Sequence, residues 1–122
     1  MRSRVRFTSY TVLMSLLLLR PPPAHAHAFL DHADPRVGST VASPPALTLE
    51  FTEPVEPAFC RVEVVGPAGN PINIGRPEHP APAMLRVALP PLPPGDYTVQ
   101  WAVVSVDTHP TEGRFTFSVK RQ

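Results

Sequence analysis

The stretch Gly95-Asp96-Tyr97-Thr98-Val99-Gln100-Trp101-Ala102-Val103 decides the class of fold. Large apolar side chains occupy every second position, namely Tyr97, Val99, Trp101 and Val103. Because successive side chains of a β-strand point to opposite faces, this alternation predicts a strand with one buried and one exposed face. A large aromatic ring on the buried face is typical of a sandwich core, so we expect Trp101 at its centre.

The same alternation returns in other segments, and turn residues separate them. The alternating apolar residues are Leu47, Leu49 and Phe51; Val62 and Val64; Leu85, Val87 and Leu89; and Phe115, Phe117 and Val119. Residues 27–122 contain 15 prolines spread between these runs, which disfavours helices. We also expect a short strand over 28–32, a weak strand over 72–74, an irregular loop or a flexible edge over 76–82, and a turn over 110–113. The sequence therefore predicts an all-β, Ig-like β-sandwich of about seven antiparallel strands.

The first 26 residues have the three parts of an export signal. Three arginines within residues 2–6 form a basic start, residues 7–19 are mostly apolar, and Ala24-His25-Ala26 matches a small-residue cleavage site. The apolar run is shorter than the roughly 20 residues that a membrane-spanning helix needs. We therefore interpret residues 1–26 as a signal peptide and residues 27–122 as one mature domain of an exported protein.

The charge of the mature chain excludes one class of function. Cleavage after Ala26 leaves seven basic and ten acidic side chains, a formal net charge of −3. A nucleic-acid-binding protein needs a basic patch or stripe, and the remaining basic residues are scattered singly, so we expect no nucleic-acid partner. The chain has one cysteine, so no intrachain disulfide can form, and we expect Cys60 to be a small buried hydrophobic residue.

Three residues of the mature chain could together bind one metal ion. After cleavage, His27 would supply its free α-amine and a ring nitrogen, which can close one chelate ring. Asp107 and His109 are two positions apart, so in an extended segment their side chains emerge on one face while Thr108 points away. Three nitrogens and one carboxylate oxygen suit tetragonal Cu(II), with Zn(II) as the main competitor. The sequence therefore indicates a Cu(II) site formed by His27, Asp107 and His109.

A metal-free interpretation of the same residues is also open. A histidine at a cleavage site can be accidental, and the segment 107–110 can be a simple turn in which Asp107 accepts local backbone hydrogen bonds. His32 and His79 are expected to be solvated surface residues. Met84 is the only methionine that remains after cleavage, so a methionine-rich Cu(I) site is excluded, and copper would be bound as Cu(II).

Several motifs occur in an order that resembles one known family. The matching segments are His27-Ala28-Phe29-Leu30, Asp34-Pro35 with Gly38-Ser39, Leu49-Glu50-Phe51-Thr52-Glu53-Pro54-Val55, Pro94-Gly95-Asp96-Tyr97-Thr98-Val99-Gln100-Trp101, Val104-Ser105-Val106-Asp107-Thr108-His109-Pro110 and Gly113-Arg114-Phe115-Thr116-Phe117. Over nearly its whole mature length the chain resembles the CopC family of periplasmic copper-resistance proteins.

What this resemblance implies is a Greek-key β-barrel or sandwich that binds Cu(II) through an N-terminal histidine, an aspartate and a second histidine. These positions fall on His27, Asp107 and His109, and the glutamate of the matching Phe-Thr-Glu-Pro-Val segment, Glu53, can lie in the outer sphere of the copper. The resemblance also implies a periplasmic, non-enzymatic carrier or sequestering protein for copper homeostasis and resistance. We expect a monomer, with a separate inner-membrane copper importer as a partner.

Two other functions are compatible with parts of the pattern. A copper site with two histidines and an N-terminal amine also resembles that of polysaccharide mono-oxygenases, which are enzymes. Those enzymes need an open coordination position, which Asp107 would fill here, and no extended aromatic platform for a glycan is visible. The other alternative is an Ig-like interaction module that binds no metal.

Overall fold

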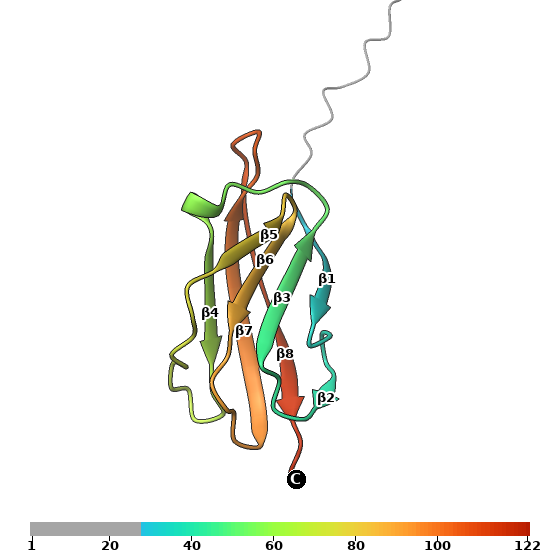
Figure 1. Cartoon of the computed structure of the whole chain (residues 1–122), viewed down its shortest axis with the longest axis vertical. Helices are drawn as coiled ribbons and strands as arrows, with labels where there is room; N and C mark the ends of the chain where they lie inside the picture. Colours follow the sequence, from blue (N-terminus) through green and yellow to red (C-terminus); the bar gives the residue numbers. More distant parts are fainter. Residues whose placement is uncertain (1–27) are drawn as a thin grey trace, which may run out of the picture.

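A computed structural model describes residues 28–122 as two β-sheets packed face to face (Figure 1). His27 and the predicted signal peptide lie outside the described residues. The described residues form eight strands and one short 3₁₀ helix: β1 (Leu30–Asp34), β2 (Thr40–Val41), β3 (Ala46–Phe51), η1 (Pro57–Phe59), β4 (Arg61–Val65), β5 (Glu78–Ala81), β6 (Met84–Ala88), β7 (Gly95–Val104) and β8 (Pro110–Val119). The predicted all-β, Ig-like sandwich is confirmed.

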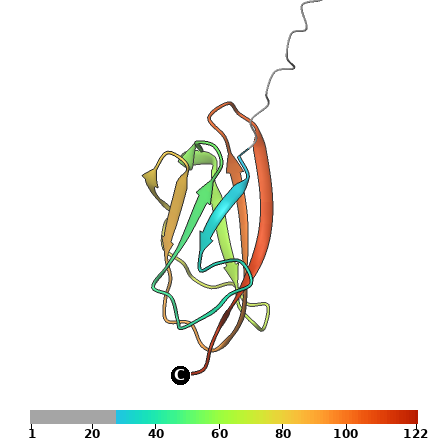
Figure 2. The ribbon, with the colours of Figure 1, turned by 90° about the vertical axis from the view of Figure 1, so that its right-hand side faces the viewer.

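The first sheet has the strand order β1-β3-β6-β5, and the second sheet has the order β2-β8-β7-β4. All pairings are antiparallel except that of β2 with β8, which is parallel. The two longest strands, β7 and β8, form one hairpin. Figures 1 and 2 show the loop of this hairpin at one end of the sandwich, close to the start of the described chain, while the C-terminus lies at the opposite end.

The alternating apolar residues face the space between the sheets, as the sequence predicts. Tyr97, Val99, Trp101 and Val103 are buried on β7, and their neighbours in sequence are more exposed. The Trp101 ring meets Phe51 of the first sheet edge to face, with the ring centroids 5.2 Å apart, so it joins the two layers. Fully burying one such side chain stabilises a fold by roughly 1.5 to 3 kcal/mol, so these buried residues contribute much of the stability of the sandwich.

Gly113 differs from its predicted place in a turn, because it lies inside β8 opposite Trp101. A Cβ atom at this position would lie only 2.5 Å from Cζ2 of the indole. The indole therefore occupies the space that a side chain at position 113 would need. The turn lies earlier, between Val104 and Pro110, and β8 is correspondingly longer than the alternation of its apolar residues indicated.

Three predictions for segments at the edges of the sheets need correction. The first strand is Leu30–Asp34 and not 28–32, because pairing with β3 sets its limits. Residues 72–74 form no strand, and this region is held by a bridge between Val65 and Pro71 and by backbone hydrogen bonds from Ile72 to Val64 and from Gly75 to Ala88. The predicted loop over 76–82 contains the edge strand β5, whose pairing with β6 is irregular. Local pattern could not identify β5, since it contains a proline and is almost fully exposed.

Within residues 28–122, no helix has the length and apolar character needed to cross a bilayer.

Candidate metal centre

The loop between β7 and β8 is a tight turn that begins at Ser105 and ends at His109. The Ser105 N–H donates to the His109 carbonyl over 3.1 Å, and the Thr108 N–H donates to the Ser105 carbonyl over 2.9 Å. Thr108 has φ +71°, a left-handed conformation that is a genuine outlier for a β-branched residue. The prediction for Asp107 and His109 assumed an extended segment. The turn shows that this segment is not extended.

The turn nevertheless brings Asp107 and His109 together. Oδ1 of Asp107 lies 3.4 Å from Nδ1 of His109, and each side chain is partly exposed. Two atoms that bind one first-row metal ion at about 2.0 to 2.2 Å each lie roughly 2.8 to 4.2 Å apart, depending on the angle at the metal. The observed separation falls in this range, so the pair can share one ion. Their proximity was predicted correctly, but the left-handed Thr108 produces it, and not strand alternation.

Ser105 binds both Asp107 and His109, and it was not among the site residues predicted from the sequence. Its side chain is 1% exposed and is the only polar residue of the described chain that is classed with the buried residues. The Ser105 hydroxyl donates to Oδ1 of Asp107 and accepts a 3.2 Å hydrogen bond from the His109 N–H. A signal for this residue was present, because the alternation of inward-facing residues on β7 continues from Val103 to position 105. A buried hydroxyl needs a partner, and Asp107 is two residues away.

Hydrogen bonding lowers the pKa of Asp107 below its usual range. The largest cause is the bond from the Ser105 hydroxyl, and the nearby His109 ring adds to it, while partial desolvation acts in the opposite direction. A carboxylate that is held ionised is ready to bind a cation without first losing a proton. The local electrostatics therefore favour cation binding at the tip of this hairpin.

The start of the described chain is tied to the same hairpin. The Thr111 hydroxyl donates to the Ala28 carbonyl over 2.6 Å, and Ala28 is fully buried. The next residue, Phe29, exchanges two hydrogen bonds with Thr52: its N–H donates to the Thr52 hydroxyl over 3.0 Å, and its carbonyl accepts from the Thr52 N–H over 2.8 Å. Residue 28, which directly follows His27, is thus fixed beside a position two residues beyond His109.

Glu53, the candidate for the outer sphere, lies in the connection that joins β3 to η1. Its neighbour Thr52 binds Phe29, and its other neighbour Pro54 accepts a 3.1 Å hydrogen bond from the Val106 N–H. Glu53 therefore lies between the segment that fixes the chain start and the segment that contacts the β7–β8 loop. Its carboxylate forms no hydrogen bond or ion pair with another described side chain, so its role in the outer sphere stays a prediction.

The other possible ligands are not gathered at this loop. His32 lies on β1 and His79 on β5, both in the first sheet and both exposed, as expected. Cys60 follows η1, packs partly against the core and donates from Sγ to the Glu56 carbonyl over 3.1 Å; burial raises the pKa of its thiol. Across residues 28–122, no three His, Cys, Asp or Glu side chains lie close enough to hold a metal. Asp107 and His109 need a further donor.

Comparisons with known proteins identify the family of the chain. Residues 30–120 match the CopC domain. The chain belongs to the CopC family. It is 39% identical to Protein YobA of Escherichia coli (strain K12), over 98% of this chain and all of that protein. The resemblance noted in the sequence is thereby confirmed.

Solved structures of the CopC family share the fold. CopC from Methylosinus trichosporium OB3b is 34% identical, with a TM-score of 0.73, over 77% of this chain and 94% of that one. PcoC from Escherichia coli, described as a methionine-rich copper resistance protein, is 33% identical, with a TM-score of 0.72, over 78% of this chain and all of that one. Family membership identifies the chain as a copper-handling protein.

Proposed function

We propose that this CopC family member is a periplasmic carrier or sequestering protein that holds one Cu(II) per chain, with His27, Asp107 and His109 as the ligands. Signal peptide cleavage after Ala26 frees the α-amine of His27. The amine and the ring of that residue supply two nitrogens, the His109 ring supplies a third, and Asp107 supplies a carboxylate oxygen. This set suits tetragonal Cu(II), and no methionine lies in the β7–β8 loop to favour Cu(I).

The observation that carries the proposal is the hydrogen bond from Thr111 to the Ala28 carbonyl. It joins residues 83 positions apart in sequence and fixes the residue after His27 beside the loop that carries Asp107 and His109. Consecutive Cα atoms are about 3.8 Å apart, so an N-terminal histidine here is within reach of that pair. The incomplete donor set of the loop supports the same assignment.

Ser105 has a supporting part in this proposal. Carboxylates that bind metal are usually held by hydrogen bonds from neighbouring groups, and such partners influence metal affinity strongly. The Ser105 hydroxyl donates to Oδ1 of Asp107, the oxygen that lies 3.4 Å from Nδ1 of His109, and so orients the carboxylate beside the histidine ring. The serine also fixes the backbone of His109, so both ligands are oriented before copper arrives.

The cellular part of the proposal rests on the sequence and the family. Residues 1–26 act as the export signal, and the periplasm is the destination. An inner-membrane copper importer is the partner for delivery, and no catalytic step is required of the protein. One relative, Copper transport protein CutJ of Bacillus subtilis (strain 168), matches this chain over 21% of its own length, so a similar domain there is part of a longer transport protein.

A competitive Cu(II) titration tests the ligand set directly. We would compare the chain 27–122 with the same chain carrying one glycine ahead of His27. The first is expected to bind one equivalent tightly, and the second much more weakly, because the added residue removes the chelate between the amine and the ring. His79→Ala serves as a matched control, since this exposed histidine lies on β5 and its replacement should leave affinity unchanged.

Each alternative result has a distinct meaning. Equal binding by the two chains would refute the N-terminal chelate and move the site to other ligands. No tight binding by either chain would leave the metal-free interaction module. Oxidation of ascorbate by the copper-loaded protein, faster than by free copper, would instead support an enzyme.

A further inference from the structure

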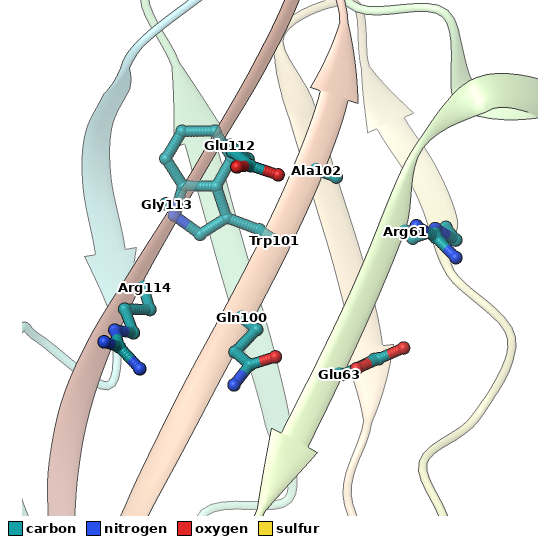
Figure 3. Close-up of a pocket in the computed structure, with 8 residues that line it drawn as sticks. All are labelled: Arg61, Glu63, Gln100, Trp101, Ala102, Glu112, Gly113 and Arg114. Carbon is teal, nitrogen blue, oxygen red and sulfur yellow. The ribbon is translucent and has the colours of Figure 1, made fainter.

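The outer face of the second sheet carries a regular pattern of charge. Strands β4, β7 and β8 lie side by side there, and their exposed residues form two rows set by strand register (Figure 3). The row nearer the β7–β8 loop contains Arg61, Ala102 and Glu112, and the next row contains Glu63, Gln100 and Arg114. The sign of the charge therefore alternates along each outer strand and across each row.

These four charges are not neutralised within the chain. Among residues 28–122, none of the four forms an ion pair. Between them lies a shallow hollow of about 480 Å³, and Ala102, at its middle strand, has only a small side chain to fill it. The face thus presents two separated cations and two separated anions around a hollow.

A second copy of the chain fits this pattern. Consider a two-fold axis that lies in the plane of the face, runs across the strands and passes between the two rows. It places Arg61 opposite Glu63 of the second copy, and Glu112 opposite Arg114 of the second copy. It also places the long Gln100 side chain of each copy over the hollow at Ala102 of the other. Every charge then faces its opposite, and size is matched as well as charge.

We propose that two copies associate through this face, with their strands antiparallel. The alternative two-fold axis, along the strands, would also pair opposite charges, Arg61 with Glu112 and Glu63 with Arg114. It would set Ala102 against Ala102, however, and leave the two hollows facing each other unfilled. Size complementarity therefore selects the antiparallel arrangement, which directs the two β7–β8 loops to opposite ends and leaves both exposed.

The residues that flank the two rows are compatible with this contact. Beyond the row nearer the β7–β8 loop lie Val104 and Pro110, and beyond the other row lie Thr98 and Thr116, all uncharged. The antiparallel two-fold axis places Val104 and Pro110 of one copy opposite Thr98 and Thr116 of the other, so these positions bury no unpaired charge. Exposed ion pairs are individually weak and are screened by salt, so the dimer belongs to the weak class of interfaces and depends on ionic strength.

This assembly differs from the monomer expected from the sequence. The pattern becomes visible only when β4, β7 and β8 are in register, because residues 61 and 112 are far apart in the chain. The inference is independent of the copper site.

Sedimentation equilibrium of the chain 27–122, at concentrations near about 100 µM, tests the dimer. We expect a monomer–dimer equilibrium at low salt whose dissociation constant rises roughly tenfold or more when salt is raised from about 50 to 500 mM. Arg61→Glu should weaken association at least as much, because it sets two acidic residues against each other. A wild-type chain that remains monomeric at low salt would overturn the proposal.

Paired charge reversals decide the orientation. Arg61→Glu with Glu63→Arg should restore the dimer, since these two positions meet across the antiparallel interface. Arg61→Glu with Glu112→Arg should not, since that pair meets only in the parallel arrangement; restoration by this second pair alone would refute the proposed geometry. Glu112→Arg with Arg114→Glu is the equivalent restoring pair on β8 and replaces the first if that variant does not fold.

Discussion

The two ends of the β7–β8 hairpin each contain a hydrogen bond from a serine hydroxyl to an aspartate carboxylate. At the open end, Ser118 donates to Asp96 over 2.6 Å, and the two residues are ordinary cross-strand partners near the surface. At the loop end, Ser105 donates to Asp107, but this serine is buried and also binds the backbone of His109. The chemistry of the bond is the same at both ends.

What differs is the surroundings of each bond. Around Ser105, the loop closes through the left-handed Thr108, and Nδ1 of His109 lies 3.4 Å from the Asp107 carboxylate. Two residues after His109, Thr111 binds Ala28 at the start of the described chain. Around Ser118 none of the described residues provides a second ligand. The comparison teaches that a serine–aspartate pair becomes part of a candidate metal site only when burial and neighbouring ligands fix its geometry.

The largest expected effect is the loss of a ligand at the loop end. His109→Ala removes an imidazole nitrogen from the proposed site, so Cu(II) affinity should fall by roughly three orders of magnitude, or about 4 kcal/mol. His79→Ala removes an exposed histidine from β5 and should change nothing. The measurement is competitive titration of both variants beside the wild type. An affinity unaltered by His109→Ala would separate the loop from copper binding altogether.

The second effect tests the difference between the Ser105–Asp107 pair and the Ser118–Asp96 pair. Ser105→Ala should lower Cu(II) affinity by roughly 10- to 100-fold, as loss of a partner to a metal ligand does. Ser118→Ala removes the same type of hydrogen bond at the open end and should leave affinity and the electron paramagnetic resonance spectrum of bound Cu(II) unchanged. Thermal unfolding of the metal-free variants controls for stability. Identical copper affinity and spectra for Ser105→Ala and wild type would reduce Ser105 to a turn residue.

A third effect follows from protonation. Copper must displace a proton from the α-amine, whose ordinary pKa is about 8, so Cu(II) affinity should fall roughly 8-fold or more between pH 7.5 and 6.5. Asp107 should not contribute in this range, because the Ser105 hydroxyl lowers its pKa and keeps it ionised. The lowered pKa of Asp107 stabilises the folded protein at pH values above the ordinary pKa of an aspartate. This stabilisation is lost as the pH falls through the pKa of Asp107 in the folded protein.

Titrations at several pH values measure this dependence. A glycine ahead of His27 moves the α-amine to another residue and should change this pH dependence, because the chelate formed by the amine and the ring of one histidine is lost. A pH-independent affinity for the unmodified chain 27–122 would argue against the proposed α-amine ligand.

The smallest expected effect concerns the link to the chain start. Thr111→Val keeps the size of the side chain but removes the hydrogen bond to Ala28, so unfolding free energy should fall by about 1 kcal/mol. Copper affinity should fall several-fold, since the chain start is less firmly held. Thr116→Val changes an exposed threonine of the same strand and is the matched control. Equal copper affinities in both variants would show that the link is not needed to form the site.

Local pattern was sufficient for most of the fold. Period-two alternation identified the inward faces of β3, β4, β6, β7 and β8, because burial of one sheet face imposes that period directly on the sequence. It failed at β5, whose limits depend on pairing with β6 and not on its own residues. It also misplaced the turn at Gly113, since a glycine can be required by a neighbouring strand, here by the Trp101 indole, as well as by a turn.

The sequence by itself determined the sandwich and its buried faces, and it made Asp107 and His109 candidate ligands, because alternation and short spacings are local properties of the chain. Only the tertiary structure decided how the two donors meet, that Ser105 fixes them, and that Thr111 holds Ala28 from 83 residues away. The rows of charge on the second sheet belong to the same category. Each of these features depends on the register between strands distant in sequence, and register is set by the packing of the whole core.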